Sequence, residues 1–255
     1  MDPIKYLKRF DAYPVKENDL QEMARLQSLH MLHIPFENLD VIRKVPIYLN
    51  LETIYDKVVN QQRGGFCYEL NGLFCWLLKE LGFDAKMISA TVVKPDGSFA
   101  KLDTHTAIIV ELDAPYLVDV GFGDSTISPI PLGGERRRDN SGTYRIVEIE
   151  TGLYELTQGN EGNEKALYRF SLDEKQLADF HEGCIFNQVS EKSTFTHDDI
   201  VTKATPDGRI TLTGTTLTRT VDGQKEKQQL SETEKTEVLE DQFGIVLHTE
   251  KPLQG

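Results

Sequence analysis

The spacing of the apolar residues changes near residue 84, and this change limits the chain to folds that join a helical part to a β-rich part. After Cys67, a stripe recurs at intervals of three and four residues, the period of a helix with one face in a core: Leu70, Leu73, Phe74, Leu77, Leu78 and Leu81. From about residue 85, β-branched residues dominate the stretches "AKMISATVV", "THTAIIVEL" and "YLVDV", which predict strands. Helices, then a block of strands, then a small mixed end predict an α+β fold.

Local signals place several element boundaries. Residues 18–33 are predicted to form a helix with Asn18 as its N-cap. Near the end of the chain, "RITLTGTTLTRTV" predicts a strand or hairpin, and a helix follows in which Ser231 is the cap and Glu234 completes a capping box. The segment 165–190 carries no decisive pattern, so its structure stays open at this point.

The composition excludes several classes of protein. Of the 255 residues, 39% are hydrophobic and 27% are charged, as in a globular protein. No apolar run approaches the roughly 18–20 residues that span a bilayer, and the start "MDPIKYLKRFDAYP" lacks the pattern of a secretory signal. We therefore expect a cytoplasmic protein without a membrane partner. The net charge of −13 would repel a phosphate backbone, so no nucleic-acid partner is expected.

The chain has three cysteines, too few and too irregularly spaced for a disulfide framework. Cys67 follows two glycines in "RGGFCYELN" and is predicted to lie in the first turn of its helix, where free N–H groups and the helix dipole lower a thiol pKa. The glycines would let the backbone pack closely against a substrate and leave N–H groups for an oxyanion. Cys75, beside the leucine stripe, is expected to be an inert small hydrophobe, and Cys184 has no comparable setting. A buried thiol in a glycine-flanked turn would explain Cys67 without catalysis.

A cysteine nucleophile needs a histidine as base and a third group that orients the histidine. His105 opens the predicted strand "THTAIIVEL", and Asp119 lies among apolar residues in the next one, where an unpaired carboxylate is costly. A connecting loop with an odd number of residues would place both on one face, directly opposite for five residues and diagonal for three. An even loop would separate them, and a satisfied core histidine beside a turn-capping acid would explain them equally well. His30 and His33 lack the spacing and the third ligand of a metal site, so no metal is expected.

Together these pieces resemble the arylamine N-acetyltransferase family. The resemblance rests on five stretches in the order of the family: "IPFENLDV" (34–41), "RGGFCYELN" (63–71), "THTAIIV" (104–110), "YLVDVGFG" (116–123) and "FGIVL" (243–247). It implies a helical bundle over 1–83 that carries the nucleophile, an antiparallel β-barrel over 84–188 that carries histidine and aspartate, and an α/β lid over 189–255. The arrangement of the triad would be papain-like.

The resemblance also implies roles for single residues. Cys67, His105 and Asp119 match the catalytic triad of the family. Phe122, Gly123 and Phe36 match positions at the substrate pocket, and Glu37 with Arg63 matches an ion pair that supports the catalytic loop. The implied reaction is ping-pong transfer from acetyl-CoA to an arylamine, arylhydroxylamine or hydrazine, with acetyl-CoA as co-substrate and no tightly bound cofactor.

Two other functions remain compatible with the sequence. A hydrolase or amidase could use the same three residues with water or a peptide in place of the acetyl donor and acceptor. Alternatively, the chain could be a binding module in which Cys67 is buried and inert. Acetyl-CoA with an aniline or hydrazine, against a peptide ester, separates the first two possibilities, and alkylation of Cys67 at neutral pH tests the third.

Overall fold

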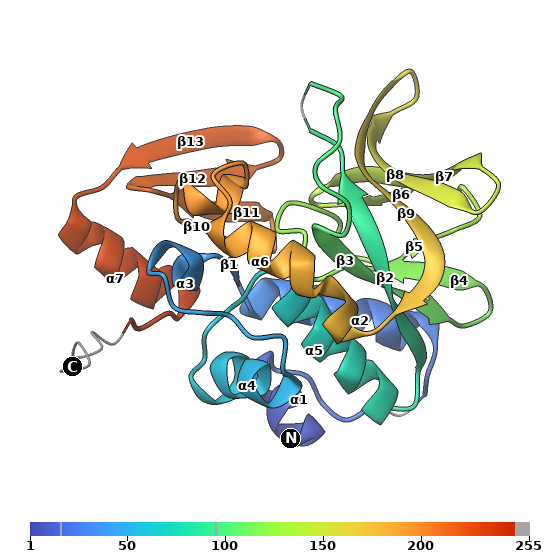
Figure 1. Ribbon diagram of the computed structural model, residues 1–255, viewed down its shortest axis with the longest axis horizontal. Coiled ribbons are helices and arrows are strands. Elements are labelled where there is room, and N and C mark those ends of the chain that lie inside the picture. The colour runs from blue at the N-terminus through green and yellow to red at the C-terminus, as the bar shows by residue number, and fades with distance from the viewer. Residues whose placement is uncertain (16, 95, 248–255) are drawn as a thin grey trace.

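The computed structural model describes residues 1–15, 17–94 and 96–247 (Figure 1). Its α-helices are α1 (Pro3–Arg9), α2 (Leu20–His33), α3 (Leu39–Ile42), α4 (Leu51–Tyr55), α5 (Cys67–Glu80), α6 (His181–Val189) and α7 (Glu232–Phe243). Its strands are β1 (Phe36–Glu37), β2 (Asp84–Val92), β3 (His105–Glu111), β4 (Pro115–Val118), β5 (Ile130–Pro131), β6 (Arg137–Asp139), β7 (Gly142–Glu150), β8 (Leu153–Asn160), β9 (Asn163–Lys175), β10 (Ile200–Thr205), β11 (Gly208–Thr213), β12 (Thr216–Val221) and β13 (Gln224–Gln229). A π-helical turn η1 (Asp56–Asn60) extends α4, and 3-10 turns η2 (Leu177–Phe180) and η3 (Thr194–Thr196) flank α6.

Helix α5 is the central helix of the fold. It contacts α1 and α4 on one side and the strands β2 and β3 on the other, and Figure 1 shows it between the N-terminal helices and the β-rich part. Its predicted apolar stripe is buried, apart from the last residue, Leu81, which is partly exposed and packs against the same core. Gly82 follows with a φ of +89°, the left-handed conformation that commonly ends a helix. The helix thus forms the boundary layer between two parts of the molecule.

The second part is an antiparallel sheet that is nearly closed. Within the described residues it has eight strands in the order β5-β4-β3-β2-β9-β8-β7-β6, and β5 near one edge also contacts β7 near the other. Closure removes most of the exposed edge of a sheet and encloses an apolar interior. That interior holds buried side chains from several strands, among them Ile88, Ile109, Leu156 and Tyr168.

The third part joins segments that are far apart in the sequence. In the part of the chain that the structure describes, a five-stranded sheet has the order β1-β10-β11-β12-β13, with β1 contributed by residues 36–37. Helix α7 covers this sheet through Leu239 and Phe243. Its capping box between Ser231 and Glu234 is the predicted one. Since β1 precedes the nucleophile helix by only 30 residues, this sheet is tied directly to the N-terminal part.

Several local predictions need correction. The N-cap of α2 is Asp19, whose carboxylate accepts a hydrogen bond from the Glu22 N–H, and not Asn18. The undecided segment 165–190 contains most of the long strand β9 and the helix α6. The predicted domain boundaries at residues 83 and 188 stay predictions, and residues 248–255 of the predicted lid lie outside the described part. No helix among the described residues is long and apolar enough to cross a membrane.

Candidate active site

Cys67 is the first residue of α5, as predicted, and Phe66 is its N-cap. Cys67 is only 2% exposed. Its Sγ lies 3.8 Å from the carbonyl oxygen of Thr104, the residue that precedes His105. The packing of α5 against β3 therefore brings the thiol to the beginning of the strand that carries the histidine.

His105 and Asp119 form a buried hydrogen-bonded pair. The β3–β4 register pairs Glu111 with Pro115, so the connecting loop has three residues, and His105 and Asp119 occupy diagonal positions on one face. Their side chains meet with 2.7 Å between Nε2 and Oδ2, at exposed fractions of 3% and 1%. Asp119 lies one residue beyond the end of β4 rather than inside a strand. Of the loop lengths that the sequence left open, the structure has the three-residue one, for which a diagonal placement of His105 and Asp119 was expected.

The Asp119 carboxylate receives three hydrogen bonds besides that of the histidine. Oδ1 accepts from Asn71 Nδ2 and from the Gly121 N–H, each at 2.9 Å, and Oδ2 accepts from the Tyr168 hydroxyl at 2.9 Å. Burial acts to raise the pKa of Asp119, but the charge and hydrogen bond of His105, with the bonds from Asn71 and Gly121, outweigh it and lower the pKa. The carboxylate is therefore ionised and fixed in orientation.

Sequence reasoning missed two of these partners. Asn71 lies four residues after Cys67, so both side chains project from the same face of α5. Its Nδ2 also donates to the Thr106 carbonyl at 2.6 Å, and its Oδ1 accepts from the Val120 N–H at 2.9 Å. The helical spacing from Cys67 was an available signal for Asn71. Tyr168 lies in the segment whose structure stayed open, so no signal pointed to it.

Several features around Cys67 act against the predicted lowering of its pKa. Burial raises the pKa of the thiol well above its usual value, and the negative charge of Asp119 adds to the increase. Hydrogen bonds from the backbone at Thr106 and Tyr68 lower the pKa but do not compensate. The first turn of a helix is thus insufficient to ionise this thiol, and a cation close to the sulfur is needed.

The glycines around the site allow neighbouring segments of the chain to approach closely, and the expected contact of these glycines with a substrate stays a prediction. Gly64 and Gly65 lack room for a side chain because Pro35, Glu37 and Glu69 lie against them. Gly121 is equally confined: an added Cβ would lie 2.8 Å from the Cys67 Cα. The loop after Asp119 is therefore in direct contact with the backbone of Cys67.

Cys67 and His105 open into one cavity of about 350 Å³. Its wall includes the rings of Phe36, Phe122 and Phe195. The Phe122 ring lies edge-on to His105, with 5.2 Å between ring centroids. Gly123 lines a neighbouring cavity of about 430 Å³, which shares all three phenylalanines with the first. The two expected aromatic residues thus line the same cavity as the thiol, whereas Gly123 lines only the neighbouring one.

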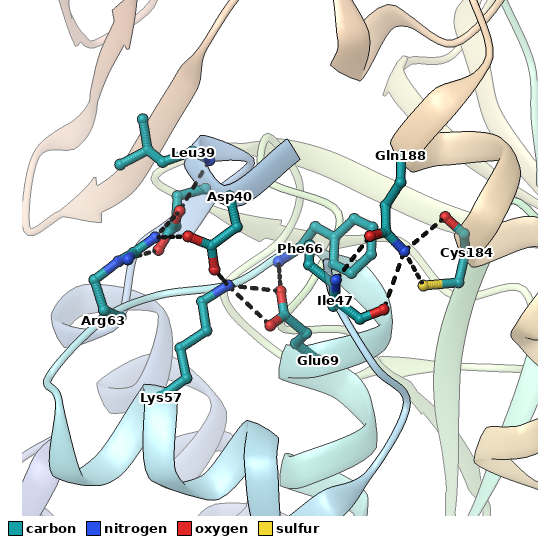
Figure 2. A network of polar contacts seen from close by, with 10 residues as sticks. Leu39, Asp40, Ile47, Lys57, Arg63, Phe66, Glu69, Cys184 and Gln188 are labelled. Carbon is teal, nitrogen blue, oxygen red and sulfur yellow. Dashed lines mark hydrogen bonds and ion pairs between the residues drawn. The ribbon is translucent and has the colours of Figure 1, made fainter. Parts of the chain in front are cut away.

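A buried network of charges supports the start of α5 (Figure 2). The predicted pair is present, with 2.7 Å between Arg63 Nε and Glu37 Oε1. Asp40 bridges Arg63 at 2.9 Å to Lys57 at 2.8 Å, and Lys57 continues to Glu69 at 2.9 Å. Burial acts to raise the pKa of Asp40, but the two cations outweigh it and lower the pKa.

The network ends on the backbone beside the nucleophile. Glu69 Oε2 accepts a hydrogen bond of 3.0 Å from the Phe66 N–H, which is one of the unpaired donors at the helix start. The Glu37–Arg63 pair was expected from the family resemblance alone, and no sequence signal pointed to Asp40, Lys57 or Glu69. Ion pairs at Arg63 thereby hold the loop before Cys67, and the Glu69 hydrogen bond holds the first turn of α5.

Cys75, Cys184 and His30 have structural surroundings. Burial raises the pKa of Cys75 to about 11 and that of Cys184 to about 12. His30 is fully buried, 2.8 Å from the Tyr6 hydroxyl, and burial lowers its pKa to about 3. No group of three or more His, Cys, Asp or Glu side chains in residues 1–15, 17–94 and 96–247 could hold a metal ion.

Comparison with known proteins places the geometry in context. The profile of an N-acetyltransferase family matches residues 19–252 of this chain. The arylamine N-acetyltransferase of the pineal gland of Gallus gallus, isozyme NAT-10, is 33% identical over 262 residues, which cover 91% of this chain and 90% of the relative.

Solved structures agree in fold. The arylamine N-acetyltransferase of Salmonella typhimurium superposes with a TM-score of 0.91 at 28% identity, covering 97% of this chain and 93% of that one. An arylamine N-acetyltransferase of Bacillus cereus superposes with a TM-score of 0.88 at 27% identity, covering 95% and 98%, and is described as having a unique Cys-His-Glu catalytic triad. These superpositions confirm the predicted α+β fold of helical bundle, β-barrel and lid.

Proposed function

Because the chain belongs to the arylamine N-acetyltransferase family, we propose that it transfers an acetyl group from acetyl-CoA to an arylamine, arylhydroxylamine or hydrazine through an acetylated Cys67. The observation that carries this proposal is the single cavity into which Cys67 and His105 both open, with His105 held from behind by Asp119. A thiol, a base and an orienting carboxylate are the components of covalent acyl transfer.

In the first half-reaction, His105 takes the proton of the Cys67 thiol as the sulfur attacks the thioester carbonyl of acetyl-CoA. Since Nε2 of the imidazole is bonded to Asp119, Nδ1 is the nitrogen that exchanges this proton. The new C–S bond forms, the bond from the acetyl carbon to the CoA sulfur breaks, and the departing thiolate takes the proton back from the imidazolium. The products are acetyl-Cys67 and free CoA.

In the second half-reaction, the amine nitrogen of the acceptor attacks the acetyl carbon and gives its proton to His105 Nδ1. The C–S bond to Cys67 breaks, and the imidazolium returns the proton to the sulfur. A thioester is already activated, so little acid catalysis of the leaving group is needed. An arylamine is a weak base and stays neutral and nucleophilic at neutral pH, which favours this class of acceptor over alkylamines.

The ionised Asp119 stabilises the imidazolium in both half-reactions. The bonds from Asn71, Gly121 and Tyr168 fix the orientation of the Asp119 carboxylate. The carboxylate in turn holds the His105 ring in place while the ring carries the extra proton. The relative from Bacillus cereus has a glutamate as its third triad member, and Asp119 supplies the same functional group here. The buried thiol, whose pKa is raised, then ionises only when its proton moves to His105.

Mass spectrometry after incubation with acetyl-CoA alone tests the proposal. We expect one added acetyl group on Cys67, which is lost when aniline is supplied, with formation of acetanilide. Cys75→Ala should behave like the unaltered enzyme, since Cys75 lies outside the cavity lining, whereas Cys67→Ala should take up no acetyl group. An unmodified protein that instead cleaves a peptide ester would support the hydrolase alternative and contradict the proposal.

A further inference from the structure

Arg209 lies on β11 of the five-stranded sheet, here called the lid sheet, and its side chain contacts the loop that follows Asp119. Its side chain is 8% exposed. Nη1 donates to the carbonyl oxygen of Gly123, and Nη2 lies 3.4 Å from that of Ser125. Nη1 also lies 3.4 Å from the Thr202 hydroxyl on the adjacent strand β10. One guanidinium group thus connects two lid strands to a loop of the β-barrel part.

Burying the charged guanidinium of Arg209 costs free energy, because the group loses its hydration. Its ion-pair partner, Asp124 Oδ1 at 3.1 Å, belongs to a side chain that is 74% exposed, so the pair is largely screened by water. Burial lowers the pKa of Arg209, and the charge of Asp124 opposes this change. Carbonyl oxygens of the loop therefore provide much of the solvation that the buried guanidinium has lost.

The loop that Arg209 holds carries an aromatic wall of the active-site cavity. At one end, the Gly121 N–H donates to Asp119 Oδ1 at 2.9 Å. At the other end lies Gly123, with a φ of +87°, where an added Cβ would lie 3.4 Å from Thr202 and from the Phe36 ring. Phe122 stands between these two fixed points, and its ring contacts His105. The position of this ring is therefore set by Asp119 on one side and by Arg209 on the other.

We propose that Arg209 is a positioning residue for acceptor selectivity, which holds the Gly123–Ser125 backbone so that Phe122 presents its ring to an aromatic amine. This inference rests on the proposed acetyltransferase function. An aryl acceptor gains from an ordered ring contact, whereas hydrazine has no ring and does not use it. Loss of Arg209 should thus impair transfer to aryl acceptors selectively and leave the triad intact.

The experiment isolates the second half-reaction. Enzyme acetylated on Cys67 is separated from CoA and mixed with aniline or with hydrazine, and the single-turnover rate is measured over a range of acceptor concentrations. The variants are Arg209→Met and Arg209→Lys. The matched control is Arg219→Met, because Arg219 lies on the neighbouring strand β12, is exposed and bonds to Gln242 Oε1 at 3.2 Å, away from the loop.

For Arg209→Met we expect the second-order rate constant for aniline to fall about tenfold, through weaker acceptor binding, and that for hydrazine to change less than twofold. Alkylation of Cys67 by iodoacetamide should also change less than twofold. Arg209→Lys, which keeps the charge but not the forked donor geometry, should lower the aniline-to-hydrazine ratio about threefold. Arg219→Met should leave the ratio unchanged.

Three results would overturn the inference. The first is an unchanged aniline-to-hydrazine ratio in Arg209→Met, and the second is an equal loss for both acceptors. The third is failure of both Arg209 variants to fold, which would assign Arg209 to the stability of the fold and not to the position of Phe122. Unaltered enzyme that acetylates neither acceptor would instead contradict the proposed function, so the two failures are distinguishable.

Discussion

The hydroxyl of Tyr168 donates a hydrogen bond of 2.9 Å to Asp119 Oδ2, the same oxygen that receives the His105 ring at 2.7 Å. Tyr168 is fully buried, and burial together with the charge of Asp119 raises its pKa well above the usual value, so the phenol keeps its proton and remains a donor. The strand β9 thereby contributes a hydrogen bond to the third member of the triad.

Tyr168→Phe removes this bond and little volume. We expect the acetylation rate of Cys67 to fall about tenfold, because Asp119 loses one of the bonds that fix it and favour its ionised form. Stopped-flow or quenched measurements of the acetyl-enzyme would provide the rate. Tyr154→Phe is a suitable control, since Tyr154 lies in the same barrel part on β8, half-buried and outside the cavity. An unchanged rate in Tyr168→Phe would remove Tyr168 from the account.

Lys57→Met should leave Asp40 and Glu69 buried with one cation fewer. Removing one member of a buried ion pair costs about 3 kcal/mol of unfolding free energy, and denaturant titration would measure it. Lys57→Arg should restore most of the loss. Lys79→Met, on the exposed end of α5, should cost little because Lys79 is 50% exposed and 3.8 Å from Glu174. Equal losses in the two methionine variants would contradict the importance of the network.

Gly121→Ala should displace the nucleophile. An added Cβ would lie 2.8 Å from the Cys67 Cα and 2.7 Å from Asn71 Nδ2, so the loop or the helix must shift. A misplacement on the order of 1 Å lowers rates about a hundredfold, and the acetylation rate of Cys67 would report it. Gly133→Ala is the control, since nothing lies within 4 Å of its added Cβ. Comparable rates for the two variants would contradict the tight contact.

His30 should make the protein acid-sensitive over a defined range. Its pKa is lowered by burial from 6.5 to about 3, so the folded state favours the neutral ring. The stability that this contributes is fully present above pH 6.5 and is lost as the pH falls toward 3. The double variant Tyr6→Phe with His30→Leu removes both partners of the buried bond and should show a weaker dependence of unfolding free energy on pH in this range. An identical pH dependence would contradict the assignment.

The sequence predicts the elements of this fold better than it predicts their contacts. The leucine stripe of α5 and the capping box at Ser231 are local patterns, and both are present in the structure. Strand β1 has only two residues, too few for any periodic signal, so its pairing with β10 could not be predicted from the sequence. Contacts of this kind depend on how distant segments pack.

The same limit applies to the candidate site. The sequence predicted where His105 and Asp119 would lie for each loop length, but the length itself, three residues, is known only from the structure. The ion pairs of Lys57 with Asp40 and Glu69 join separate helices, and burial of Cys67 depends on the whole core. Burial and the charge of Asp119 therefore oppose the effect of the helix start on the pKa of the thiol. A pKa depends on the surrounding dielectric as much as on position in a helix.

The pH dependence of Cys67 alkylation by iodoacetamide, compared between the unaltered enzyme and His105→Gln, tests most directly whether the imidazole ionises the buried sulfur. We expect the unaltered enzyme to react at pH values well below about 8.5, the pKa of a free thiol, as a thiolate–imidazolium pair. In His105→Gln the profile should move above that value, because burial and Asp119 then act on the thiol unopposed. Coincident profiles for the two proteins, or a profile of the unaltered enzyme that rises only above pH 8.5, would contradict the account.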